Sequence, residues 1–139
     1  MKAQVYTKNR DGRRLWVLEA RSADHSLAEA STRLANLRMV FFDPKQGESV
    51  LTADQGEFLP REDRVRVRAN VVLTDGQGTT VRTTTLEYVD ADRSLRSDNP
   101  VTILSHGLTV TGTGLRIDTE QRRITVHGRV RALLPAAAR

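Results

Sequence analysis

The chain has 139 residues, of which 38% are hydrophobic and 28% are charged, and its formal net charge is +5. A chain of this length is expected to fold as one domain with its own core. It contains no cysteine, which excludes disulfides, zinc–thiolate sites and cysteine nucleophiles. No apolar stretch approaches the roughly 20 residues that a membrane helix needs, and no signal-peptide pattern is present.

The positive charge is typical of a solvated surface, although a basic surface can also meet an anionic partner such as nucleic acid or phosphorylated lipid. No basic run with interleaved aromatic residues is present, and this argues against nucleic acid.

Alternating runs on both sides of Asp11-Gly12 predict a β-hairpin near the N-terminus. Its strands are expected at residues 5–8 and 13–23. The side chains of the second strand that are expected to face inward are Trp16, Leu18 and Ala20.

Residues 24–37 fit two interpretations, because their leucines and alanines have the spacing of an amphipathic helix. Ser31-Thr32 and the following run Arg38–Phe42 favour strands, and we expect strands from about Ala28 onward. A turn is predicted at Asp43–Gly47. Residues 37–50 then form a degenerate first copy of the repeat that follows.

A unit of about 30 residues occurs three times between Leu51 and Leu133, which indicates stacked supersecondary units. Each unit has a first alternating run, a polar turn and a second alternating run. The first runs are Leu51–Phe58, Val81–Tyr88 and Val110–Ile117, and the second runs begin at Val65, Leu95 and Ile124.

The two runs of each unit differ in their alternation. The second runs keep one parity, with valines on one face and Arg64, Arg66 and Arg68 on the other, as in a sheet with one packed side. The first runs change parity in the middle, with Gly56 and Gly114 at or next to the change, so we expect a bulge or bend there. Strands that bend in register predict an all-β, jelly-roll-like sandwich.

The sequence contains no motif for catalysis. His25, His106 and His127 lack metal-ligand spacing, and Glu57 and Glu87, which share a repeat position, are expected to be outward-facing strand residues. We therefore expect a protein that is not an enzyme and that holds no metal or cofactor. The aliphatic interior suits an ordinary core or an acyl-binding groove, and the strand edges suit partners that add a strand.

Two further function classes are compatible with a β-sandwich. One is a scaffold module that carries no lipid. The other is a sugar-binding sandwich, but this class relies on exposed aromatic residues and only 4% of the chain is aromatic.

Several motifs, taken in order, resemble the LptC family of lipopolysaccharide-export proteins. They are Trp16-x-Leu18-x-Ala20, Leu51-Thr52-Ala53-Asp54-x-Gly56, Asn70-Val71, Ser97-x-Asn99-Pro100-Val101, Gly112-x-Gly114-Leu115 and Gly128-x-Val130. The related LptA and the periplasmic domain of LptD share the repeat. The short single domain and the Trp16 opening resemble LptC more than an LptA-like bridge component.

The resemblance implies a twisted antiparallel β-jelly-roll at residues 13–134, after an N-terminal strand or linker at 1–12 and before a flexible tail at 135–139. It also implies a periplasmic protein anchored in the inner membrane by one helix, expected upstream of Met1. Such proteins accept lipopolysaccharide from an ABC transporter at their N-terminal edge. They pass it to LptA at their C-terminal edge.

The resemblance, combined with the alternation, leads to two sets of candidate residues. The lipid-binding groove is expected to be lined by Phe58, Val65, Val67, Val71, Leu73, Tyr88, Leu95, Val101, Ile103, Ile117, Val126 and Val130. The partner edge strands are expected to contain Arg13, Leu15 and Val17 at one end and Ile124, Val126, Gly128 and Val130 at the other.

Overall fold

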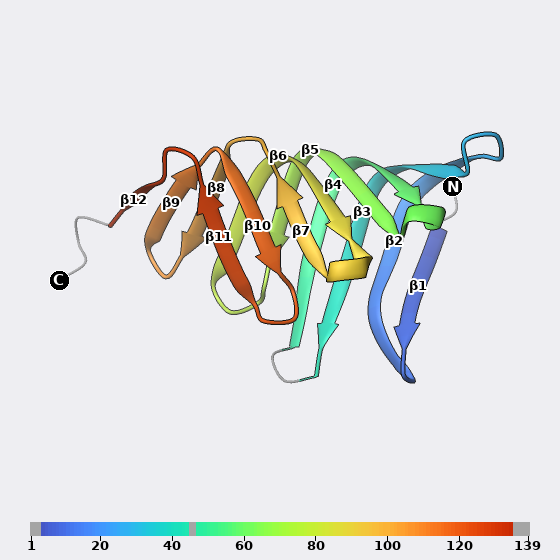
Figure 1. The fold of residues 1–139 in the computed structure, drawn as a ribbon, viewed down its shortest axis with the longest axis horizontal. Coiled ribbons are helices and arrows are strands. Elements are labelled where there is room, and N and C mark those ends of the chain that lie inside the picture. The colour runs from blue at the N-terminus through green and yellow to red at the C-terminus, as the bar shows by residue number, and fades with distance from the viewer. Residues whose placement is uncertain (1–3, 45–46, 135–139) are drawn as a thin grey trace.

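A computed structural model describes residues 4–44 and 47–134. Apart from two short 3₁₀ turns, the regular elements of these residues are all β-strands, and Figure 1 shows them following one another along the long axis of the molecule. The strands are β1 (Gln4–Arg10), β2 (Arg13–Ser26), β3 (Ser31–Asp43), β4 (Gly47–Leu59), β5 (Arg64–Thr74), β6 (Thr79–Val89), β7 (Ser94–Ser97), β8 (Val101–Ser105), β9 (Leu108–Gly112), β10 (Gly114–Asp118), β11 (Arg123–His127) and β12 (Arg131–Leu133). The 3₁₀ turns are η1 (Pro60–Glu62) and η2 (Asp90–Asp92).

The sheet has two layers, and β6 is the last strand that belongs to both of them. The first half of β6 pairs with β8 at Thr79–Thr83, and its second half pairs with β7 at Glu87–Val89. From there the first layer continues through β9 to β12, and the second layer continues through β10 to β11. The long strands β2 to β6 pass through both layers. The result is the antiparallel β-jelly-roll that the sequence predicts.

Each long strand bends where it passes from one layer to the other, along a line that we name the fold line. The register of β5 with β6 shifts between Arg68 and Val71, where Ala69 and Asn70 have φ angles of 68° and 52°. The extra residue of this bulge is therefore on β5. Asn70 Nδ2 donates a 2.6 Å hydrogen bond to Asp54 Oδ2 on β4, which ties two neighbouring bends together.

A bend is present, but its bulge lies on β5, a second run, and not on the first runs where it was expected. The glycines of the first runs also have a different role from the expected one. Neither Gly56 nor Gly114 has a positive φ angle, so neither supplies the unusual backbone conformation. A Cβ atom at Gly56 would overlap the side chain of Leu37, and one at Gly114 would overlap the ring of His127. These glycines allow neighbouring side chains to lie close to the backbone.

The core lies between the two layers and contains the alternating residues expected to face inward. Trp16, Leu18 and Ala20 are buried, as predicted from the hairpin. Val65 and Leu73 are buried on opposite sides of the bulge in β5, so the same face stays inside through the bend. His25, His106 and His127 are all exposed.

The segment at residues 24–37 is extended, which excludes the helical alternative, but its turn comes earlier than expected. β2 continues to Ser26, and β3 begins at Ser31. Ala30, with φ of 50°, closes the hairpin, and Glu29 N donates to Ser26 Oγ at 3.2 Å. The expected strand start at Ala28 is therefore wrong, because a side-chain-to-backbone hydrogen bond forms the turn there. The predicted tail at 135–139 lies outside the described residues.

Candidate functional site

The predicted groove residues lie on the inner faces of the layers, with one exception. Val126 and ten other predicted residues belong to the buried core or pack against it. The exception is Val130, which lies between β11 and β12 and is 55% exposed. The ten are Phe58, Val65, Val67, Val71, Leu73, Tyr88, Leu95, Val101, Ile103 and Ile117. Most of these side chains are almost fully covered by their neighbours, so the interior is filled.

The interior is aromatic toward its N-terminal end. A chain of ring contacts joins both layers, with centroid distances of 5.1 to 6.2 Å. Its members, in order, are Tyr6, Phe58, Trp16, Tyr88 and Phe41. Beyond Tyr88 the buried hydrophobic residues are aliphatic, such as Leu95, Val101 and Ile103. The two ends of the interior therefore differ in shape and stiffness.

The side opposite the fold line is a seam, along which turns of the two layers face each other. Asp90, at the start of η2 in the second layer, accepts hydrogen bonds from Trp16 Nε1 at 3.3 Å and from the Tyr88 hydroxyl at 2.9 Å. Lys8 Nζ on β1 lies 3.7 Å from Asp90 Oδ2. Burial, followed by the charge of Asp90, raises the pKa of Tyr88 far above its ordinary value. The phenol therefore stays protonated and donates.

A second link across the seam is made by Arg122, in the turn between β10 and β11. Its guanidinium lies 4.0 Å from Asp43 Oδ2 and 3.8 Å from Asp75 Oδ2. Asp43 is the last residue of β3 and Asp75 lies in the turn after β5, both in the first layer. Oδ1 of Asp75 also accepts hydrogen bonds from the backbone N–H groups of Gln77 and Thr79, at 2.8 and 3.1 Å. Asp75 thus serves both as a turn residue and as an ion-pair partner. An aspartate in a turn sequence gives no signal for such an ion pair.

A cavity of about 900 Å³ opens on the seam beside Arg122, and we name it the mouth. Such a volume lies within the range of small-molecule sites, about 300–1,000 Å³. Its apolar part is formed by interior residues, namely Leu15, Phe41, Leu73, Val81, Tyr88 and Leu95. Its rim carries Arg10, Arg13, Arg14, Arg93 and Arg122, together with Asp11, Asp43, Asp75 and Glu120. The mouth is therefore an apolar opening with a charged rim.

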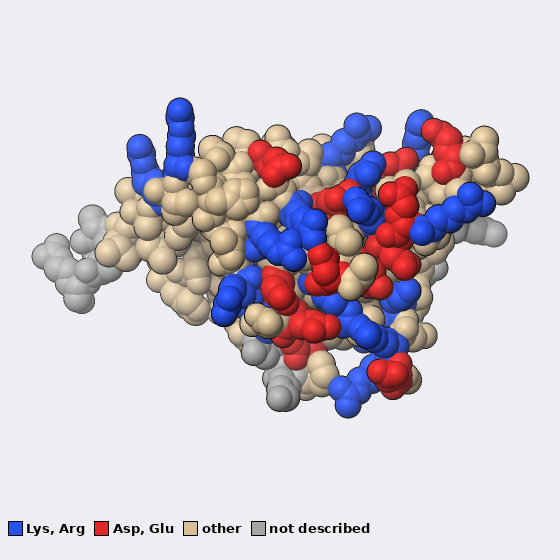
Figure 2. All heavy atoms as spheres, viewed as in Figure 1, with Lys and Arg blue, Asp and Glu red and all other residues tan. Residues whose placement is uncertain are grey.

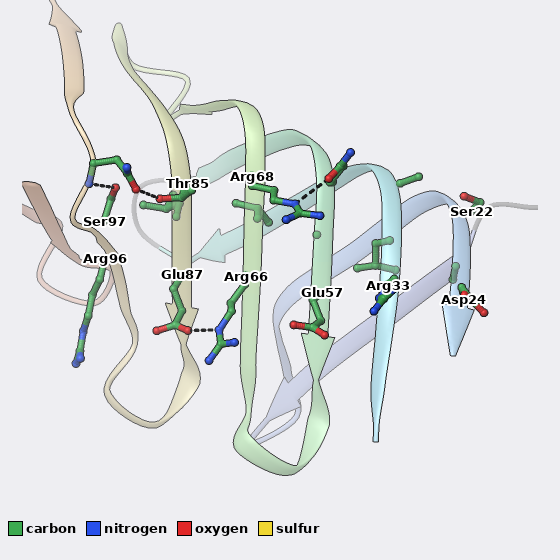
Figure 3. A pocket seen from close by; sticks show the side chains of 18 of the residues that line it. Ser22, Asp24, Arg33, Glu57, Arg66, Arg68, Thr85, Glu87, Arg96 and Ser97 are labelled. Atoms are coloured by element: carbon green, nitrogen blue, oxygen red, sulfur yellow. Dashed lines mark hydrogen bonds and ion pairs between the residues drawn. The ribbon is translucent and has the colours of Figure 1, made fainter. Parts of the chain in front are cut away.

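The outer face of the second layer carries a row of charged side chains, one from each successive strand (Figure 3). In register order the row is Asp24, Arg33, Glu57, Arg66, Glu87, Arg96 and Arg116. Arg66 Nε donates a 2.6 Å hydrogen bond to Glu87 Oε2, and this bond raises the pKa of Arg66. Opposite charges on adjacent strands stabilise a sheet by about 0.2–1 kcal/mol per pair.

Figure 2 shows acidic and basic side chains intermingled over much of this face, with few near the C-terminal strands. Glu57 and Glu87 point outward, as predicted, and Arg66 lies between them in the register. They therefore form no carboxylate pair of the kind that catalyses acid–base chemistry. Among the residues described, no three histidine, aspartate or glutamate side chains gather closely enough to hold a metal ion.

The ends of the layers are strand edges. Among the strands that the structure describes, β11 pairs only with β10 and β12 pairs only with β9, so each layer ends there on a strand with one unpaired side. Ile124 and Leu133 on these strands are 38% and 59% exposed. Gly128 and Val130 lie in the segment that joins the two strands. Backbone groups and apolar side chains are thus accessible together at the C-terminal end.

At the N-terminal end the predicted edge residues need a correction. Arg13, Leu15 and Val17 lie on β2, and the first half of β2 is paired on its other side with β1. The edge of the first layer is therefore β1 itself. The alternation identified both strands of the hairpin, but it cannot show which strand of a hairpin faces the rest of the sheet.

Comparison with known proteins agrees with this architecture. The family model described as "Lipopolysaccharide-assembly, LptC-related" matches residues 1–134. This chain belongs to the LptC-related family. Membership of this family supports a role in lipopolysaccharide transport, and this agrees with the resemblance seen in the sequence. No curated protein matches the chain.

A solved structure with a similar fold is LptH from Pseudomonas aeruginosa, described as the LptA-homologous periplasmic component of the lipopolysaccharide transport device. The TM-score is 0.66 at 13% sequence identity, and the similarity covers 86% of this chain and 94% of LptH. At this identity the comparison supports the fold. Within the described part of this chain, no helix is both long and apolar enough to cross a membrane.

Proposed function

We propose that this protein binds the acyl chains of lipopolysaccharide between its two layers and transfers the molecule along its long axis. The observation that carries this proposal is the apolar interior, which opens at the mouth on the seam. Exposing acyl chains to water costs about 0.8 kcal/mol per methylene group, so a carrier must offer continuous apolar surface. The interior extends from Leu73 and Leu95 at the mouth to Ile103 near the C-terminal end.

Because the interior is filled, lipid must separate the layers to enter. The fold line is continuous backbone, whereas the seam is closed by side chains such as Arg122 and Asp90. Opening at the seam therefore breaks side-chain contacts and leaves the strand pairing intact. The acyl chains enter from the seam and pack against the aliphatic residues beyond Tyr88.

The proposed direction of transfer follows from the two ends. The N-terminal edge, β1, receives lipopolysaccharide from an inner-membrane ABC transporter. The C-terminal edges, β11 and β12, dock on an LptA-like bridge protein, which adds a strand to one of them. Exposed Ile124 and Leu133 give this edge apolar contacts that a partner would bury.

A pair of neighbouring residues on β8 tests the groove. Ile103 is 6% exposed and points inward, whereas Leu104 is 39% exposed. We expect a photo-crosslinking amino acid at Ile103 to capture lipopolysaccharide, and the same substitution at Leu104 to capture little. Ile103→Asp should reduce lipid loading more than Leu104→Asp does. Equal capture at both positions would contradict the groove.

The C-terminal docking is tested separately. Crosslinkers at Thr125 and His127 on β11 should capture an LptA-like partner, whereas one at Arg82 on the inner strand β6 should not. Failure at every β11 and β12 position would remove this part of the proposal without affecting lipid binding.

A scaffold module without lipid is the second candidate, and the filled interior favours it. An LptA-like bridge component is a third, since LptH shares the fold. Mass spectrometry of lipid extracted from the purified protein distinguishes the scaffold, which would contain none. Crosslinking of β1 to a transporter distinguishes the bridge component, which would lack this contact.

A further inference from the structure

The charges on the rim of the mouth are distributed unevenly. Glu120 is paired with Arg93 at 3.0 Å, and Asp43 and Asp75 face Arg122. On the β1–β2 side of the rim, three arginines surround one acidic residue; in chain order these are Arg10, Asp11, Arg13 and Arg14. This side of the rim has an excess of positive charge directly beside an apolar opening.

Two arginines of the rim contact the last residues of β3. The Arg14 guanidinium lies 4.8 Å from the centre of the Phe42 ring, and the next residue, Asp43, lies 4.0 Å from Arg122. Arg14 is on the first layer and Arg122 is on the second. The rim of the mouth therefore carries guanidinium groups from both layers.

Arg122 is held loosely enough to change partner. Its contacts of 3.8 and 4.0 Å with Asp75 and Asp43 are longer than hydrogen bonds, which lie near 2.7–3.2 Å. A phosphate can accept two parallel, shorter bonds from one guanidinium, and such charge-assisted pairs are stronger than neutral ones. A phosphate at the mouth therefore competes well with two distant carboxylates.

We propose that the mouth is a binding site for the phosphate groups of the lipid whose acyl chains enter the interior, with Arg122 exchanging Asp43 and Asp75 for phosphate. This inference rests on the proposed function and adds recognition of the anionic head. The exchange removes a contact that holds the seam together. Binding of the head and opening for the acyl chains are thus coupled through one side chain.

The test compares lipid A with the same lipid after removal of its phosphates, each carrying a fluorescent acyl chain, by anisotropy with the full chain. The wild-type protein should bind the phosphorylated form roughly tenfold more tightly, as expected for a charge-assisted hydrogen bond. Arg122→Gln should abolish most of this preference. Because it also removes a contact that closes the seam, it should bind the dephosphorylated lipid at least as tightly as the wild-type protein does. The preference should fall with added salt.

Two variants make the result specific. Arg116→Gln removes an arginine from the outer face, where it contacts Asp92 at 3.5 Å, and should keep the full preference. The double variant Asp43→Asn with Asp75→Asn removes the two carboxylate charges that compete with phosphate for Arg122, so it should increase the preference for phosphorylated lipid. The amide oxygen at position 75 can still accept the backbone hydrogen bonds of the turn.

Three outcomes would overturn the inference. An unchanged preference in Arg122→Gln would show that Arg122 does not bind phosphate. Inorganic phosphate binding as tightly as lipid A would show that the site is not a lipid site. If dephosphorylated lipid bound and no preference existed, this inference alone would fail, whereas failure of both lipids to bind would also refute the proposed function.

Discussion

The indole Nε1 of Trp16 donates a hydrogen bond to Asp90 Oδ1, 3.3 Å away across the seam and 74 residues further along the chain. Trp16 is on the first layer and Asp90 begins a turn of the second. Tyr88 donates to the same oxygen at 2.9 Å. One carboxylate therefore satisfies two buried aromatic side chains and links the layers at the N-terminal end of the seam.

Replacing Asp90 by alanine should destabilise the fold strongly. It leaves the Trp16 and Tyr88 donors buried without a partner, and each unsatisfied donor costs about 1–3 kcal/mol. We expect a loss of roughly 2–4 kcal/mol in the free energy of unfolding, measured by urea denaturation. Asp63→Asn is the control, since the exposed Asp63 side chain has one ion pair among the described residues, with Lys8 at 3.6 Å, and asparagine tolerates the φ angle of 49°; its loss should stay within about 0.5 kcal/mol. Equal losses would refute the role of Asp90.

The bulge on β5 predicts a substitution that stabilises the protein. Ala69 has a φ angle of 68°, a left-handed conformation that costs a residue with a Cβ atom about 1–2 kcal/mol. Ala69→Gly removes this cost, but the glycine loses more conformational entropy on folding, which costs about 0.5–1 kcal/mol. The net gain should be about 0.5 kcal/mol, visible as a higher melting temperature. Ala53→Gly, at a buried position without a positive φ, should lower it.

Gly56 should not tolerate a larger side chain. A Cβ atom there would overlap Leu37 Cδ2 and lie 3.1 Å from the carbonyl oxygen of Arg66. Because overpacking costs about 1–3 kcal/mol, Gly56→Ala should destabilise the fold by that amount. Shortening Leu37 to valine in the same chain should recover part of the loss. Additive effects of the two substitutions, measured as a double-mutant cycle, would show that they do not interact.

Asp92 should contribute to the dependence of stability on pH. The hydrogen bond from Ser94 Oγ, at 2.7 Å, and the charges of Arg96 and Arg116 lower its pKa below the ordinary 3.8. A lowered pKa in the folded state gives stability that is present above the unfolded pKa and is lost as pH falls through the folded value.

An NMR titration of the Asp92 carboxyl carbon should therefore give a midpoint below pH 3.8. Ser94→Ala should raise this midpoint, because the hydrogen bond from Ser94 is the largest cause of the shift. Arg33→Gln, at the other end of the charge row, should leave the Asp92 midpoint unchanged. A midpoint that does not respond to Ser94→Ala would contradict the assigned cause.

The strands and their inward faces could be predicted from the sequence to a large extent. Trp16 and Leu18 in the hairpin and Val65 and Val67 in the repeat were correctly predicted to be buried, because alternation is a local property of extended chain. The bend was also predicted, from the parity change between Thr83 and Leu86. The residue that forms it, Ala69, was not identified, since an alanine gives no signal for a positive φ angle.

The seam was missed. Asp43, Asp75 and Asp90 stand in sequences typical of turns, where turn chemistry is enough to account for an aspartate, and Asp75 does accept the backbone hydrogen bonds of a turn. The available signal was the recurrence of acidic residues in turns on both sides of each unit. That signal cannot identify the partner, which lies on the other layer.

By itself the sequence determined the element type, the repeat and the apolar face, because side-chain direction along a strand depends only on neighbouring residues. Only the tertiary structure decided that β1 covers β2, that Arg122 faces Asp43 and Asp75, and that the interior opens at the seam. These relations depend on how two layers close on each other. Closure brings together residues that are far apart in the chain, and no local pattern records their distance.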